Sequence, residues 1–206
     1  MIGIIDYGLS NLNSICNAVL HLNQKIKIID KKSDFSQFDK LILPGVGSFP
    51  KAVENLKKRQ LFDLIIKDVL IKKKPILGIC LGMQLLFGDS SENGKTKGME
   101  ILKGNVKILK SNNNFKVPNI GWKRIQIYKK GVLLQDIEEE PIFYFIHKYA
   151  CYSKEKNIIR SKLVHIKNEF DCLIEKQNIF ATQFHPEKSQ KIGIKLLKNF
   201  INYSNK

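Results

Sequence analysis

The feature that most constrains this chain is a short apolar segment that runs into a cysteine flanked by two glycines. Residues 75–79 are typical of a short buried strand, and a helical pattern begins at Leu81. Gly78 and Gly82 stand on either side of Cys80. A sharp strand-to-helix turn strains its central residue, and a Cβ at the neighbouring positions would clash. The pattern therefore predicts a nucleophile elbow with cysteine in the place of serine.

The predicted elbow would place the thiol of Cys80 at the exposed N-terminus of a helix. The helix dipole and the free backbone N–H groups there favour the thiolate, which is the nucleophilic form. The alternative is an ordinary buried cysteine, because free cysteine is among the most buried residue types. Residues 78–82 alone leave both interpretations open.

A second segment far along the chain, residues 183–187, favours the catalytic interpretation. A cysteine nucleophile needs a base and the base needs an orienting group, and both can be distant in sequence. His185 and Glu187 flank Pro186, which we expect to keep the chain extended so that both side chains project to one side. The sequence therefore predicts a triad in which His185 faces Cys80 and Glu187 lies behind it.

Together these motifs resemble the class I glutamine amidotransferases, which use a Cys-His-Glu triad. The resemblance runs from residues 6–8, Asp-Tyr-Gly, to residues 183–189 and so spans nearly the whole chain. Within the family, the likeness is greatest to the glutaminase subunits of histidine biosynthesis. It implies hydrolysis of glutamine to glutamate and ammonia, without cofactor or metal. It also implies a heterodimer with a (β/α)8-barrel cyclase subunit, which uses the ammonia to make imidazole glycerol phosphate and an aminoimidazole carboxamide ribotide.

Residues 44–47, Pro-Gly-Val-Gly, close a predicted strand. Two glycines let a peptide plane rotate, so that a backbone N–H can point at a developing oxyanion. By itself the segment would be taken as a plain glycine turn. The resemblance instead implies an oxyanion hole formed by Val46, Gly47 and the N–H of Leu81.

Gln84 lies one helical turn after Cys80, on the same face of the predicted helix. Glu92 lies in the loop that follows, where a carboxylate can hold the ammonium group of a substrate. Each would ordinarily be a surface residue, but the resemblance matches both to residues that bind glutamine. The residues that it places near the partner and the ammonia channel are Tyr144, His147 and Lys188.

Departures from the family pattern cluster at positions expected to face the partner. They are Ser10, Asn119, Ile120, Lys123 and Lys148. An alternative is therefore a paralogous glutaminase that feeds ammonia to another synthase, such as a bacterial surface-sugar amidotransferase. From a different class, the chain could be an inactive scaffold or a nucleic-acid adaptor. The intact triad positions argue against the scaffold, and the absence of aromatic-plus-arginine clusters argues against the adaptor.

Strand and helix patterns alternate through the first part of the chain, and strand-like runs dominate from Gly104 onward. The expected later strands are Val106–Leu109, Arg124–Tyr128, Ile142–Ile146, Ile158–His165, Cys172–Glu175 and Ile179–Phe184. We expect an α/β fold in three layers, with a mostly parallel central sheet, helices on both faces and antiparallel additions. This is the flavodoxin-like arrangement of class I glutamine amidotransferases. The 43% hydrophobic content suffices for one core, which predicts a single domain over residues 1–206.

The formal net charge of +16 comes almost entirely from lysine, with arginine only at Arg59, Arg124 and Arg160. We therefore favour a solvated lysine surface over nucleic-acid binding, which draws on clustered arginine and lysine. The four cysteines are widely spaced, which favours neither a zinc site nor a disulfide framework and fits a reduced cytoplasm. The first residues are too briefly apolar for a signal peptide or a membrane span.

Overall fold

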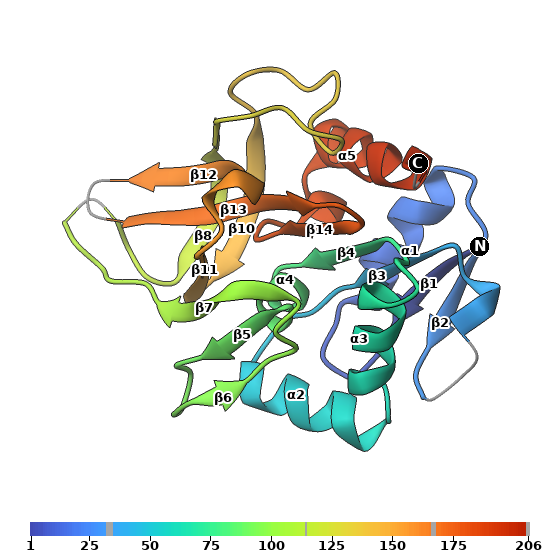
Figure 1. Ribbon diagram of the computed structural model, residues 1–206. Coiled ribbons are helices and arrows are strands. Elements are labelled where there is room, and N and C mark those ends of the chain that lie inside the picture. Colours follow the sequence, from blue (N-terminus) through green and yellow to red (C-terminus); the bar gives the residue numbers. More distant parts are fainter. Residues whose placement is uncertain (32–34, 114, 166–167, 205–206) are drawn as a thin grey trace.

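The computed structural model describes residues 1–31, 35–113, 115–165 and 168–204 (Figure 1). In chain order the elements are β1 (Ile2–Ile5), α1 (Leu12–His21), β2 (Ile26–Ile29), η1 (Phe35–Gln37), β3 (Lys40–Leu43), α2 (Phe49–Lys58), α3 (Phe62–Leu70), β4 (Ile76–Ile79), α4 (Leu81–Leu85), β5 (Phe87–Ser90), β6 (Thr96–Lys97), β7 (Leu102–Ile108), β8 (Asn119–Arg124), β9 (Gln126–Ile127), β10 (Ile142–His147), β11 (Tyr149–Ser153), η2 (Lys156–Ile158), β12 (Ile159–His165), β13 (Asn168–Lys176), β14 (Ile179–Thr182), η3 (Pro186–Lys188) and α5 (Gln190–Asn202).

One half of the main sheet is parallel, with strands in the order β2, β1, β3, β4 and β14. Every residue of β1, β4 and β14 is buried, as expected for parallel strands that helices cover on both faces. Figure 1 shows α2 and α3 on one face of this sheet, and α1 and α5 on the other. The predicted α/β fold with three layers is therefore confirmed.

Two hydrophobic cores result from the alternation of side chains along the parallel strands. On one face, Ile5 and Leu43 pack in a cluster with the apolar side chains of α2 and α3. On the other face, Ile4 and Ile42 pack in a cluster with those of α1 and α5. A helix on either face needs only one apolar stripe to be buried in this way, which matches the spacing of apolar residues in the sequence.

The other half of the sheet is built largely from antiparallel pairs, which continue from β14 through β13 and β11 to β7. The predicted antiparallel additions are thus confirmed. Strands β8 and β10 form a separate two-stranded ribbon. One predicted strand was wrong: the run over 124–128 is divided between the end of β8 and the short β9. The strands β5, β6 and β11 and most of β8 were not expected. These elements are polar or mixed in sequence, so pairing with a neighbour decides their structure.

The parallel half positions the two predicted catalytic motifs. Strands β4 and β14 are neighbours, with Ile79 opposite Thr182. Cys80 follows β4 directly, and residues 183–187 follow β14. Both motifs therefore emerge at the carboxyl end of the sheet, where open α/β sheets place their ligands. No helix in the described part of the chain is both long and apolar enough to span a membrane.

Candidate active site

Cys80 occupies the strained turn between β4 and α4, with φ 55° and ψ −107°. Its backbone N–H donates to the Thr182 carbonyl at 2.7 Å, and its carbonyl accepts from the N–H of Gln84 at 3.1 Å to begin the helix. A Cβ added at Gly82 would lie 1.7 Å from the carbonyl oxygen of Leu43. Only glycine fits there, because β3 passes so close to the turn. The geometry is that of the predicted nucleophile elbow.

The sequence predicted an exposed thiol at Cys80, but the residue is buried, with only 4% of its surface accessible. The end of β10 lies against it, with Sγ of Cys80 3.9 Å from the carbonyl of Ile146. The thiol nevertheless lines a pocket of about 250 Å³. The lining residues are Val46, Gly47, Cys80, Leu81, Gln84, Glu92, Ile146, His147, Lys148 and Tyr149. A buried cysteine can therefore still meet a substrate here, because it lines a partly open pocket.

His185 and Glu187 form a buried pair, in which Nδ1 of His185 donates to Oε1 of Glu187 at 2.7 Å. The expected local extension was wrong for part of the segment: His185 is extended, whereas residues 186–188 form the single 3-10 turn η3. Proline fits the first position of such a turn because it lacks the N–H that the turn would leave unpaired. The turn brings Glu187 back toward the His185 ring. The sequence had predicted that Glu187 lies behind this ring.

The imidazole of His185 is strongly basic in this setting. Burial lowers its pKa, but interactions with the Cys80 thiolate and with Glu187 outweigh burial and raise the pKa to about 10. Its other nitrogen, Nε2, is buried and makes no hydrogen bond of standard geometry with any described residue. A protonated ring near the cysteine, with an uncommitted N–H, is suited to protonate a leaving group.

The loop 44–47 does not present an oxyanion hole in this structure. The N–H of Val46 donates to the Leu9 carbonyl at 2.8 Å, and the N–H of Leu81 donates to the Gly45 carbonyl at 3.3 Å. The carbonyl of Gly45 thus accepts from the Leu81 N–H, which was predicted to bind the substrate oxyanion. Gly47, at φ 101°, has the conformational freedom expected of a hinge in this loop.

The two predicted glutamine-binding residues both line the pocket beside Cys80. Nε2 of Gln84 donates to the Tyr149 carbonyl at 2.9 Å, which fixes the buried amide. Oε2 of Glu92 accepts from the N–H of Phe49 at 2.8 Å and so caps the N-terminus of α2. This bond fixes the carboxylate at the pocket.

Gln183 is a fully buried neighbour of the sulfur to which the sequence analysis assigned no role. Its Nε2 lies 3.8 Å from Sγ of Cys80, and its Oε1 accepts from Nε2 of Gln84 at 3.3 Å and faces Sγ of Cys151 at 3.8 Å. Its place immediately before the His-Pro-Glu motif was visible in the sequence. Its contact with sulfur depends on the pairing of β4 with β14, which the sequence does not display.

His147 is fixed as a neutral core histidine. Its Nδ1 donates to the Tyr149 carbonyl at 2.8 Å, so its Nε2 is the acceptor for Nδ2 of Asn119 at 2.9 Å. Burial lowers its pKa to about 4. His147 lines the pocket, but its basicity does not suit it to be the general base.

Tyr144 and Lys188 meet beside the ribbon of β8 and β10, with Nζ of Lys188 lying 5.9 Å from the ring centre of Tyr144. Tyr144 also packs edge-on against Trp122, which is 47% exposed. The register of the ribbon places Tyr144 opposite Trp122 and Ile146 opposite Ile120. Exposed apolar side chains on one face of the ribbon, next to the pocket, are typical of a protein interface.

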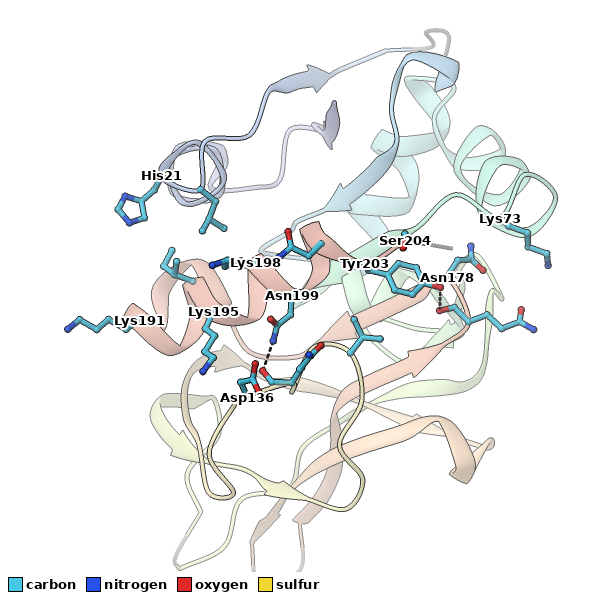
Figure 2. Close-up of a pocket in the computed structure, with 16 residues that line it drawn as sticks. His21, Lys73, Asp136, Asn178, Lys191, Lys195, Lys198, Asn199, Tyr203 and Ser204 are labelled. Atoms are coloured by element: carbon cyan, nitrogen blue, oxygen red, sulfur yellow. Dashed lines mark hydrogen bonds between the residues drawn. The ribbon is translucent and has the colours of Figure 1, made fainter. Parts of the chain in front are cut away.

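A larger open groove of about 1640 Å³ lies elsewhere, along α5 (Figure 2). Lys191, Lys195 and Lys198 project from α5 there, whereas Asn199 is already bonded to the carbonyls of Leu133 and Gln135. The groove contains none of the predicted catalytic residues. No group of three or more potential metal ligands of the His, Cys, Asp and Glu types occurs among residues 1–31, 35–113, 115–165 and 168–204.

Comparison with known proteins identifies the family to which the chain belongs. The family model "Glutamine amidotransferase class-I" matches residues 3–203. The chain is 42% identical over 201 residues to "Imidazole glycerol phosphate synthase subunit HisH 1" of Campylobacter jejuni (strain RM1221), covering 98% of this chain and 99% of that protein. It is 44% identical over 203 residues to "Imidazole glycerol phosphate synthase subunit HisH" of Methanocaldococcus jannaschii, covering 98% of each.

Among solved structures, a crystal structure described as a glutamine amidotransferase matches with a TM-score of 0.75 at 16% identity, covering 97% of this chain and 96% of that one. A chain from "Structure of PurLQS from Thermotoga maritima" matches with a TM-score of 0.74 at 17% identity, covering 98% and 97%. At these identities the structures support the fold alone. The family match and the full-length relatives go further: the chain belongs to the class I glutamine amidotransferases and is an enzyme of that family.

Proposed function

We propose that this chain is the glutaminase subunit of an imidazole glycerol phosphate synthase, acting in histidine biosynthesis. The observation that carries the proposal is the Cys80, His185 and Glu187 constellation, in a chain whose full-length relatives bear the name of that subunit. A paralogue that feeds a surface-sugar synthase is not favoured, because these relatives are named for the histidine-pathway enzyme.

The first half of the proposed reaction forms a glutamyl thioester. The Cys80 thiolate attacks the side-chain amide carbon of glutamine, so a C–S bond forms and the carbonyl oxygen becomes negatively charged. The His185 imidazolium gives its proton to the nitrogen. The C–N bond then breaks, and ammonia leaves.

The second half releases glutamate. The thioester carries no negative charge on sulfur, so the interaction that most raises the pKa of His185 is lost and the neutral ring can act as a base. His185 then removes a proton from water, which attacks the thioester carbon. The C–S bond breaks, glutamate leaves and the thiolate is restored. The net reaction converts glutamine and water to glutamate and ammonia. Gln84 and Glu92 would hold the amino-acid end of the substrate.

The loop 44–47 supplies the regulation in this proposal. A rotation of the peptide between Gly45 and Val46 would withdraw the Gly45 carbonyl from Leu81 and turn the Val46 N–H toward the same point. Two donors would then converge on the oxyanion. One such donor is worth on the order of a hundredfold to a thousandfold in rate. The isolated subunit would therefore be a poor glutaminase that its partner activates.

We infer that the partner is a (β/α)8-barrel cyclase subunit in a heterodimer. The supporting features are the names of the relatives, which are subunits of a synthase, and the exposed face of the β8–β10 ribbon. Tyr144 and Lys188 lie beside this face, whereas His147 is buried and lines the pocket. We propose that ammonia passes these three residues on its way from the pocket to the partner. We further propose one domain over residues 1–206 and a cytoplasmic location, in keeping with the family match over residues 3–203 and a biosynthetic role.

A comparison of nitrogen sources tests the proposal. The chain and its cyclase subunit are assayed together with glutamine or with an ammonium salt, using wild type and Cys80→Ser. Wild type should use both sources. The variant should lose glutamine-dependent synthesis by at least about a thousandfold and retain the ammonium-dependent reaction, because only the thiolate forms the thioester.

Two results would contradict the proposal. Retained glutaminase activity in Cys80→Ser would remove the cysteine from its role. Loss of the ammonium-dependent reaction in the same variant would mean that this chain contributes to the synthase chemistry itself. Cys16→Ser serves as the matched control, because Cys16 is a half-buried thiol on α1 that does not line the pocket.

A further inference from the structure

One buried polar atom near the pocket has no partner in this conformation. Tyr7 is fully buried, yet its hydroxyl makes no hydrogen bond with any described residue. A buried hydroxyl without a partner is costly, and phenylalanine would avoid that cost in the same space. A second conformation in which the hydroxyl is bonded would account for the tyrosine.

The hydroxyl of Tyr7 lies against the loop that must move. A Cβ added at Gly45 would come within 1.8 Å of it, so the hydroxyl lies directly beside the Gly45 backbone. Tyr7 is absent from the lining of the catalytic pocket. It is therefore placed to act on the loop and not on the substrate.

Rotation of the Gly45–Val46 peptide leaves the Gly45 carbonyl in need of a new donor. In the present structure this carbonyl accepts from the N–H of Leu81, while the N–H of Val46 donates to the Leu9 carbonyl. Rotation of this peptide exchanges the directions in which the Gly45 C=O and the Val46 N–H point. The Gly45 carbonyl then points toward the Leu9 carbonyl. Two carbonyl oxygens cannot bond each other, so an external donor is required.

We propose that the Tyr7 hydroxyl is that donor: it bonds the Gly45 carbonyl after rotation and so holds the loop in the catalytic conformation. Tyr7 is thereby a positioning residue, which acts through the Val46 N–H on the oxyanion. The inference rests on the proposed glutaminase function and names the device that stabilises its active state. The resting state keeps an unpaired hydroxyl, and the active state pairs it.

The test is Tyr7→Phe, measured in the complex with the cyclase subunit. One hydrogen bond lost in the active state should lower the partner-stimulated kcat for glutamine by about threefold to tenfold. KM for glutamine should stay unchanged, because Tyr7 does not line the pocket. The rate of Cys80 alkylation by iodoacetamide should also stay unchanged, since that reaction uses no oxyanion hole. The free variant should unfold at the same temperature as wild type or above it, because a buried unpaired hydroxyl has been removed.

Tyr203→Phe is the matched control, because it removes a hydroxyl that donates to the Gln177 carbonyl at 3.3 Å far from the pocket. Stimulated kcat within twofold of wild type in Tyr7→Phe overturns the inference, as does an equal loss in Tyr203→Phe. Co-elution of the two subunits in size-exclusion chromatography confirms that each variant complex is assembled. Absence of partner stimulation in wild type would instead refute the proposed function, so the two failures are distinguishable.

Discussion

The nucleophile elbow and the proposed oxyanion loop both lie at the carboxyl end of the parallel sheet. The elbow already has the geometry proposed for catalysis, whereas the loop does not. At the elbow, Cys80 is held in its strained turn, and His185 is bonded to Glu187. In the loop, the Val46 N–H donates to Leu9, and the Gly45 carbonyl occupies the Leu81 N–H. The groups proposed to attack and to transfer protons are in place. The N–H groups proposed to stabilise the developing charge instead donate to the Leu9 and Gly45 carbonyls.

The difference follows from how each segment is bonded. The elbow is fixed by backbone bonds to β14 and by the close passage of β3, so it has one arrangement. The loop is flanked by glycines and rests on single hydrogen bonds, so a second arrangement is accessible at small cost. Separating a rigid reactive centre from a movable stabilising group lets an enzyme keep its nucleophile ready without consuming substrate.

Apart from removal of the Cys80 thiol, the largest expected effect comes from filling the space beside the loop. In Gly45→Ala the new Cβ would lie 1.8 Å from the Tyr7 hydroxyl and 3.0 Å from Cβ of Leu81, so the loop must move away from the elbow. The partner-stimulated glutaminase rate should fall on the order of a hundredfold, as for loss of an oxyanion donor. Alkylation of Cys80 should proceed at the wild-type rate.

Gly94→Ala provides the control, because nothing lies within 4 Å of a Cβ added there. A Gly45→Ala variant that retains full stimulated activity would show that the loop does not supply the oxyanion hole. A fall in Cys80 alkylation as large as the fall in hydrolysis would show that the elbow and the loop form one rigid unit.

An intermediate effect is expected at the elbow itself from Glu187→Gln. Glutamine can keep a hydrogen bond to Nδ1 of His185 but removes a negative charge that helps to raise the pKa of this ring to about 10. The pKa of His185 should therefore fall, and the alkaline limb of the kcat/KM profile should move to lower pH. The rate at neutral pH should drop by about tenfold, because orientation is only partly lost.

The same shift has a consequence for stability. The pKa of His185 is raised above its ordinary 6.5, so its charged form stabilises the fold fully below about pH 6.5, and this contribution is lost as the pH rises through about 10. Thermal unfolding of Glu187→Gln should therefore differ from wild type most on the acidic side of this window. An unmoved alkaline limb together with unchanged stability would remove Glu187 from the triad.

The smallest effect on catalysis is expected from Trp122→Ala on the face of the β8–β10 ribbon. Loss of this exposed indole should weaken partner binding by roughly tenfold, as for a moderate interface anchor. The glutaminase rate at saturating partner should be unchanged, because Trp122 does not line the pocket. Titration of activity against cyclase concentration measures both quantities. Tyr128→Ala, another exposed aromatic, is the control. A lower rate at saturation would mean that the ribbon transmits the activating signal.

Much of the elbow could be predicted because its constraints are local. The apolar strand, Gly78 and Gly82 around Cys80, and the helix after it require one kind of turn, which the structure contains. The three-layer fold was equally accessible, since alternating strand and helix patterns imply parallel strands covered on both faces. The strands of the second half were harder to predict. β11 and the boundary of β8 depend on which neighbour they pair with, and their own residues are polar or mixed.

The proposed reactive groups could be identified from local sequence: a cysteine in a turn that only flanking glycines allow, and a histidine and a glutamate two residues apart. How these groups are buried, and which backbone donors beside them are occupied, depends on contacts between segments that are distant in sequence. Pairing of β4 with β14 brought Gln183 against the sulfur, and the end of β10 lies against the thiol that was expected to be exposed. Tertiary contacts also set the orientation of the Gly45–Val46 peptide. A glycine-flanked peptide has two accessible orientations of similar local energy, and contacts with Leu9 and Leu81 select between them.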